Sequence, residues 1–115
     1  MNQTIYKYEV GALGVTEIEG SITKFLTIQY QHNTRKMCLW ALIDKDIPKK
    51  KYVIGCYGTG HEVDACVKGD DYIGTVQVMD GQMVLHYFAV AVDELMKRQK
   101  ESQAEISPEL EMEMS

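Results

Sequence analysis

The chain has 115 residues, of which 45% are hydrophobic and 25% charged, so it has room for one compact domain and lies outside the composition of disordered proteins. Its net charge of −5 is uneven, because residues 1–92 carry −1 and residues 93–115 carry −4. A nearly neutral body excludes a broad basic surface for extended nucleic-acid binding. No run approaches the roughly 20 apolar residues of a membrane helix, and the start lacks a secretory signal, so we expect a cytoplasmic protein without membrane contact.

Four strands are predicted in the first half of the chain, over residues 4–10, 22–32, 36–43 and 51–58, with a short turn at residues 33–35. The second strand alternates and is predicted to be half-buried, with Ile22, Leu26, Ile28 and Tyr30 on one side. The Gly-rich segment 11–20 is predicted as loop with a short strand at most. The run 36–43 is apolar without alternation, which predicts a strand covered on both faces or one whose outer face meets a partner or the tail. Since one thin sheet does not cover both faces, a homo-oligomer is expected.

The strongest local signal is a hairpin, in which residues 72–79 and 82–90 flank the Asp80-Gly81 pair of a two-residue type I′ turn. This loop length fixes the register and places His86 opposite Thr75. The predicted pairs are Met79 with Gln82, Val78 with Met83, Val76 with Leu85, Gly74 with Tyr87 and Tyr72 with Ala89. One face of this hairpin is apolar and is expected to face the core.

After residue 90 the apolar period changes to three and four, with acidic residues first and basic residues last, which predicts a C-terminal helix over residues 91–102. Residues 103–115 are acidic and are predicted to be disordered. The expected fold is therefore mainly β (α+β), with a β-rich domain over residues 1–90. Its five to six strands form an antiparallel meander or a small, partly closed barrel, followed by one helix.

A candidate binding site follows the fourth strand, at Tyr57-Gly58-Thr59-Gly60-His61. Two glycines let the backbone approach a bound anion or ring, Thr59 offers a hydroxyl, and His61 offers a group that titrates near neutral pH. Trp40 and His86 complete the predicted ligand-binding set. The alternative interpretation is a strand-to-loop corner that needs its glycines and leaves a histidine exposed.

Metal and catalytic sites are not indicated. Three cysteines form no C-x-x-C pair, and the even spacing of Cys56, His61 and Cys66 lacks the close ligand pairs of structural zinc. His61 and Asp64 have the spacing of a base and its orienting carboxylate, but this pattern is common by chance. The sequence predicts no metal, no cofactor and no catalytic residue, and it favours binding over catalysis.

Several blocks of the chain together resemble a known family. These blocks are Ile5-Tyr6-Lys7-Tyr8, CLWALID (38–44), YGTGH (57–61), YIGTVQ (72–77) and LHYF (85–88). Over residues 4–89 the chain is similar to a family of small, largely uncharacterised β-rich proteins encoded by bacteriophages and prophages. The resemblance implies an accessory protein in the cytoplasm of a bacterial host cell, and no catalytic residue is carried over from it.

Small phage accessory proteins often resemble inhibitors of host defence. We therefore expect a noncatalytic protein that sequesters a small nucleotide-like signal molecule. An alternative function is a protein-binding inhibitor of a host defence or regulatory protein. A third alternative is a small enzyme that uses His61 as its general base.

Overall fold

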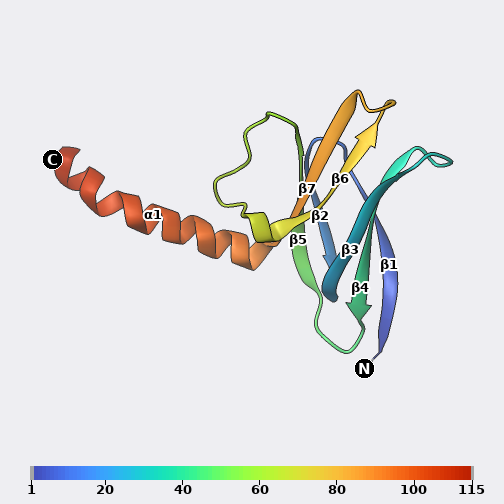
Figure 1. Cartoon of the computed structure of the whole chain (residues 1–115). Coiled ribbons are helices and arrows are strands. Elements are labelled where there is room, and N and C mark those ends of the chain that lie inside the picture. The colour runs from blue at the N-terminus through green and yellow to red at the C-terminus, as the bar shows by residue number, and fades with distance from the viewer. Residues whose placement is uncertain (1, 115) are drawn as a thin grey trace.

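The computed structural model describes the backbone of residues 2–114 and the side chains of residues 2–103. Seven strands form two antiparallel sheets, and a helix leaves them at the C-terminal end (Figure 1). The three-stranded sheet has the order β1-β4-β3, and the four-stranded sheet has the order β2-β5-β7-β6. The elements are β1 (Gln3–Val10), β2 (Gly14–Gly20), β3 (Ile22–Gln31), β4 (Lys36–Asp44), β5 (Lys50–Gly58), the 3₁₀ helix η1 (Gly69–Asp71), β6 (Tyr72–Val78), β7 (Met83–Ala91) and α1 (Val92–Met114).

The prediction of a mainly β fold with one C-terminal helix is confirmed. The seventh strand is β2, which lies in the segment predicted as loop. Because the chain changes sheet after β1, β2 and β4, its described strands form two antiparallel sheets joined by crossovers and do not close into one barrel. Within the described residues, no helix combines the length and the apolar character needed to cross a membrane.

The core lies between the two sheets, and the most deeply buried side chains come from both. β4 is the central strand of its sheet, and Leu39 and Ala41 on its inner face are fully buried. Leu85 and Tyr87 of β7 face them from the other sheet and are also fully buried. The Tyr87 hydroxyl donates a hydrogen bond to the Gly11 carbonyl at 2.9 Å, which ties the four-stranded sheet to the turn after β1.

The predicted register of the β6–β7 hairpin is confirmed from Val78 opposite Met83 to Gly74 opposite Tyr87. The predicted Met79–Gln82 pair lies in the turn and not in the ladder, because β6 ends at Val78 and β7 begins at Met83. The prediction for Tyr72 is wrong, because a bulge at Ile73 pairs Tyr72 with Phe88 instead of Ala89. One extra residue reverses the face of the residues beyond it. Tyr72 is therefore 49% exposed. Ile73 packs against the core in its place.

A bulge has the same effect in β3. The register shifts between Phe25 and Thr27, so Leu26 is the extra residue. The alternating pattern predicts Leu26 on the core side, but it is exposed, and Phe25 packs against the core. Phe25 makes an edge contact with Tyr52 of β5, with ring centroids 5.4 Å apart.

Helix α1 is held to the loop before β6 by a partly buried ion pair. Arg98 Nη1 donates to Asp71 Oδ2 at 2.7 Å and to the Cys66 carbonyl at 3.0 Å, and Arg98 Nε donates to Glu94 at 3.1 Å. The helix runs to Met114, beyond the predicted end at residue 102. The side chains of residues 104–115 lie outside the described part, and the disorder expected for residues 103–115 stays a prediction.

Candidate functional site

The corner predicted from the sequence lies where β5 ends. Gly58 closes the strand, and the His61 amide donates to the Gly58 carbonyl at 3.1 Å to form a turn. The His61 ring lies against Gly58, so a Cβ at Gly58 would come within 2.9 Å of His61 Cε1. Gly60 has a φ of +87°, which favours glycine. Both glycines are thus explained by the shape of the corner itself.

His86 is brought to this corner by the pairing of β5 and β7, which places it opposite Tyr57. Its Nε2 is hydrogen bonded to Thr59 Oγ1 at 2.7 Å, and its Nδ1 to Thr75 Oγ1 at 2.9 Å. Thr75 is bonded in turn to the Tyr72 hydroxyl at 2.6 Å. The predicted juxtaposition of His86 with Thr75 is confirmed. Both ring nitrogens are already occupied, so a ligand would have to displace a threonine to reach them.

The corner does not form the wall of a large cavity. The nearest hollow is a small one of about 90 Å³ whose lining includes Tyr57 but neither Thr59 nor His61. Trp40 is not part of this group, because it lies in β4 of the other sheet. The structure thus brings together Tyr57, Gly58, Thr59, Gly60, His61 and His86 and leaves Trp40 apart.

The catalytic and metal alternatives find no support at this corner. Asp64 Oδ1 accepts a hydrogen bond from the Cys66 amide at 2.8 Å, which fixes the Asp64 carboxylate as part of its own loop. Cys56 is buried in β5. Among the residues that the structure describes, no three His, Cys, Asp or Glu side chains gather as a metal site would require.

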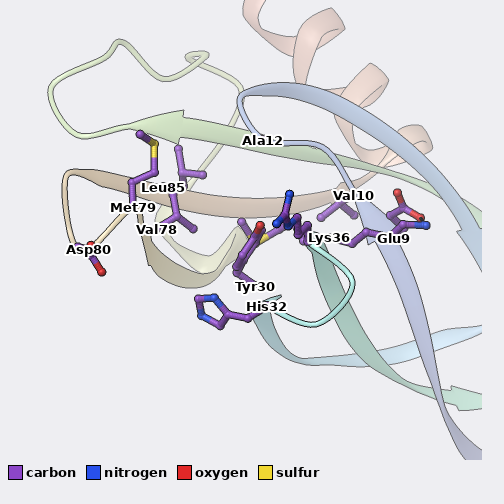
Figure 2. A pocket seen from close by; sticks show the side chains of 12 residues that line it. Glu9, Val10, Ala12, Tyr30, His32, Lys36, Val78, Met79, Asp80 and Leu85 are labelled. Carbon is purple, nitrogen blue, oxygen red and sulfur yellow. Dashed lines mark ion pairs between the residues drawn. The ribbon is translucent and has the colours of Figure 1, made fainter.

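A much larger cavity lies elsewhere, between the β3–β4 turn and the β6–β7 turn, and has a volume of about 580 Å³ (Figure 2). We call it the hairpin-tip cavity. It falls within the range of about 300–1,000 Å³ that is typical of small-molecule sites. Its apolar lining is formed by Val10, Ala12, Met37, Val78, Met79 and Leu85. Its polar lining is formed by Glu9, Tyr30, His32, Arg35, Lys36 and Asp80.

Charged groups stand on opposite sides of the hairpin-tip cavity. Lys36 is paired with Glu9 at 3.2 Å on one side, while Asp80 belongs to the opposite turn (Figure 2). Arg35 is exposed and makes no ion pair with any residue in the described part of the chain. The guanidinium is therefore free to receive an anion in a bidentate contact.

Two rings lie beside these charges. Tyr30 and His32 make an edge contact with their centroids 4.9 Å apart (Figure 2). Tyr30 is half-buried and also packs against the core. A planar group that enters the cavity can therefore contact an aromatic ring at one side and the apolar lining at the other.

Of this cavity, the sequence predicts only the two turns that border it. The sequence predicts a turn at residues 33–35 and another at Asp80-Gly81, and both are present. What it could not indicate is that the two turns lie at the same end of the two sheets (Figure 1). Neither Arg35 nor Asp80 belongs to a motif that marks a ligand.

Taken together, the fold and the cavity define a small two-sheet β protein with a polar-rimmed cavity at its hairpin tips and no metal cluster among its described residues. The chain belongs to the family described as "Domain of unknown function (DUF7352)", whose model matches residues 1–97. Searches of curated proteins and of solved structures found no match. The matched range covers both sheets and the first six residues of α1.

Proposed function

We propose that the protein binds a small nucleotide-like molecule without catalysing a reaction on it, and that the ligand occupies the hairpin-tip cavity. The observation that carries this proposal is a cavity of about 580 Å³ with an apolar lining, two aromatic rings and an unpaired arginine. A polar corner that borders a hollow of only about 90 Å³ is a poorer candidate, so we move the proposed site from Thr59 and His61 to the hairpin tips.

Each part of a nucleotide has a matching group in the cavity. A phosphate is received by Arg35, whose planar guanidinium makes bidentate contacts with phosphate oxygens. The base lies against Tyr30 and the apolar lining. The Asp80 carboxylate accepts hydrogen bonds from N–H groups on the edge of the base.

Backbone geometry also supports a site here. Arg35, Met79 and Asp80 have φ values of +56°, +54° and +56°, in the left-handed region that costs non-glycine residues about 1–2 kcal/mol each. All three line the cavity. The turn at Asp80-Gly81 accounts for the φ of Asp80, whereas Arg35 and Met79 are residue types that rarely adopt a positive φ, and strain of that kind is concentrated at functional sites.

The lining favours binding over turnover. None of its twelve residues is Ser, Thr or Cys, so the described cavity lacks the hydroxyl or thiol nucleophile of serine-type and cysteine-type enzymes. Sequestration of a nucleotide signal, in the setting of a phage protein that counteracts bacterial defence, is the biological role we propose. That setting rests on the resemblance of the sequence blocks alone.

Calorimetry and thermal-shift measurements with cyclic and linear nucleotides test the proposal. Arg35→Ala should weaken binding of the stabilising nucleotide at least tenfold, because it removes the phosphate contact. Thr59→Ala is the matched control, since it alters only the corner at the end of β5, and binding should be unchanged. Mass spectrometry of the incubated nucleotide should return it intact.

Three outcomes contradict the proposal in different ways. If Thr59→Ala weakens binding and Arg35→Ala does not, the ligand lies at the corner after β5. If the nucleotide is converted, the protein is an enzyme. If no nucleotide stabilises the protein, the alternative of an inhibitor that docks on a host defence protein takes its place.

A further inference from the structure

The outer face of the three-stranded sheet carries an apolar strip. Trp40 points outward, because its neighbours Leu39 and Ala41 are fully buried on the inner face. Leu42 shares the outer face with Trp40 and is paired with Ile5 of β1, which is 58% exposed. Helix α1 packs on β5 and β7 of the other sheet. The side of β4 that bears Trp40 is the one that the apolar run 36–43 predicts to be covered.

Two lysines flank this strip. Lys7 lies directly opposite Trp40 in β1, and Lys24 lies opposite Leu42 in β3. The Lys7 ammonium donates to Gln31 Oε1 at 3.1 Å, so its charge is not neutralised there. Neither lysine has a carboxylate partner among the described residues. The face therefore suits a partner that is both apolar and acidic.

The chain itself contains a segment of this composition. Residues 104–115 include four glutamates and no basic residue, together with Ile106, Leu110, Met112 and Met114. Residues 104–114 end a helix of 23 residues, which spans about 34 Å at the usual rise per residue. Figure 1 shows α1 pointing away from both sheets, so the end of the helix does not fold back toward β4 of its own chain.

We propose that two copies of the chain pair reciprocally, with residues 104–115 of each copy lying on the apolar strip around Trp40 of the other copy. Such an arrangement is closed and two-fold symmetric, so it limits assembly to a dimer. It covers Ile5, Trp40 and Leu42 and places the acidic segment next to Lys7 and Lys24. It is independent of the proposed ligand, because these five residues do not line the hairpin-tip cavity.

Sedimentation velocity and intrinsic fluorescence of the full chain test this interface together. Trp40 is the only tryptophan, so its emission reports directly on the covered face. We expect a dimer at high micromolar concentration that dissociates on dilution, with a shift of the emission to longer wavelength. Raising the salt concentration should weaken the dimer, since the contact is partly electrostatic.

Charge variants identify the contact. Lys7→Glu/Lys24→Glu should weaken the dimer at least tenfold, and so should Glu109→Lys/Glu113→Lys. Combining all four changes in one chain should restore the dimer, because the pairs are then reversed. Lys49→Glu is the control, since it makes one Lys→Glu substitution of the same kind in the turn before β5, and it should leave the dimer intact.

Two results overturn the proposal. A full chain that remains monomeric at every concentration has no such interface. A dimer that persists in both charge-reversed double variants is held by another surface. Far-ultraviolet circular dichroism of each variant verifies that loss of the dimer is not loss of the fold.

Discussion

The ion pair between Asp71 and Arg98 provides a sensitive test of how α1 is attached. Asp71 and Arg98 have side chains that are only 10% and 17% exposed, and Asp71 Oδ2 also accepts the Lys68 amide at 2.7 Å. Asp71→Asn keeps the size of the side chain. It removes the negative charge and points N–H groups at the Arg98 guanidinium.

The expected loss is about 2 kcal/mol of unfolding free energy. Breaking a fully buried pair costs roughly 3–5 kcal/mol, and a hydrogen bond to a charged group contributes roughly 1.5–3 kcal/mol. The loss is expected at the lower end of these free-energy ranges, because Arg98 keeps its contacts to Glu94 and to the Cys66 carbonyl. For a chain of this size the melting temperature should fall by about 8 °C.

The pH dependence gives the decisive measurement. Burial alone would raise the pKa of Asp71, but hydrogen bonds from Arg98 and the Lys68 amide, together with the charge of Arg98, hold the pKa below its ordinary value of 3.8. The stability from this carboxylate is thus present above pH 3.8 and is lost as the pH falls through the lowered pKa. Thermal denaturation followed by circular dichroism should show a large difference between wild type and Asp71→Asn at neutral pH that shrinks in acid.

Asp70→Asn is the matched control for this experiment. Asp70 is the exposed neighbour of Asp71 in η1, and its substitution removes the same charge. It should change the melting temperature by a degree or two at most, as surface substitutions usually do. If Asp71→Asn melts like the control at neutral pH, the ion pair does not hold α1 to the loop and the reasoning fails.

Three further changes test the core. Tyr87→Phe removes the hydrogen bond to the carbonyl of Gly11 and should cost about 1 kcal/mol in urea unfolding. Burial, followed by contact with the Cys56 thiol, raises the pKa of Tyr87, so wild-type stability should decline above about pH 10 as the unfolded chain loses its proton, and the Phe variant should lack this contribution. Gly20→Ala places a methyl group on the Tyr8 hydroxyl and should cost about 2 kcal/mol, and adding Tyr8→Phe should recover part of this loss. Leu39→Ala should cost about 3 kcal/mol by thermal melting, because the side chain is fully buried, and a loss below 1 kcal/mol would contradict its place in the core.

The parts of the fold that the sequence predicts well are those set by local chemistry. Asp80 and Gly81 have the positive φ angles that their turn needs, and the register of β6 and β7 follows from it as far as Gly74. Beyond Gly74 the prediction fails, because a bulge is a response to packing. Neither Ile73 nor Tyr72 carries a local signal that decides which of them turns inward.

Strand β2 was missed for a related reason. Its inward positions are Thr16, Ile18 and Gly20, of which only Ile18 has a large apolar side chain, so no alternation is visible. Gly20 is required there because the Tyr8 side chain occupies the space where a Cβ would stand. The contact between β1 and β2, which belong to different sheets, therefore requires a glycine at position 20. In the sequence alone, that glycine indicates a loop.

The hairpin-tip cavity depends on packing to an even greater degree. The β3 and β6 edges approach each other closely at Gly74, where a Cβ would lie 3.2 Å from Ile28 Cγ2, and the cavity is bounded by the turns that follow these strands. The separation of Arg35 from Asp80 is therefore governed by how tightly the two edges meet. Since each turn contributes one charge, neither alone resembles a binding motif. The YGTGH segment, in contrast, does resemble a binding motif in sequence. In the structure, however, its histidine packs against Gly58 and donates its amide hydrogen to the Gly58 carbonyl, so fewer of its groups are left for a ligand to contact.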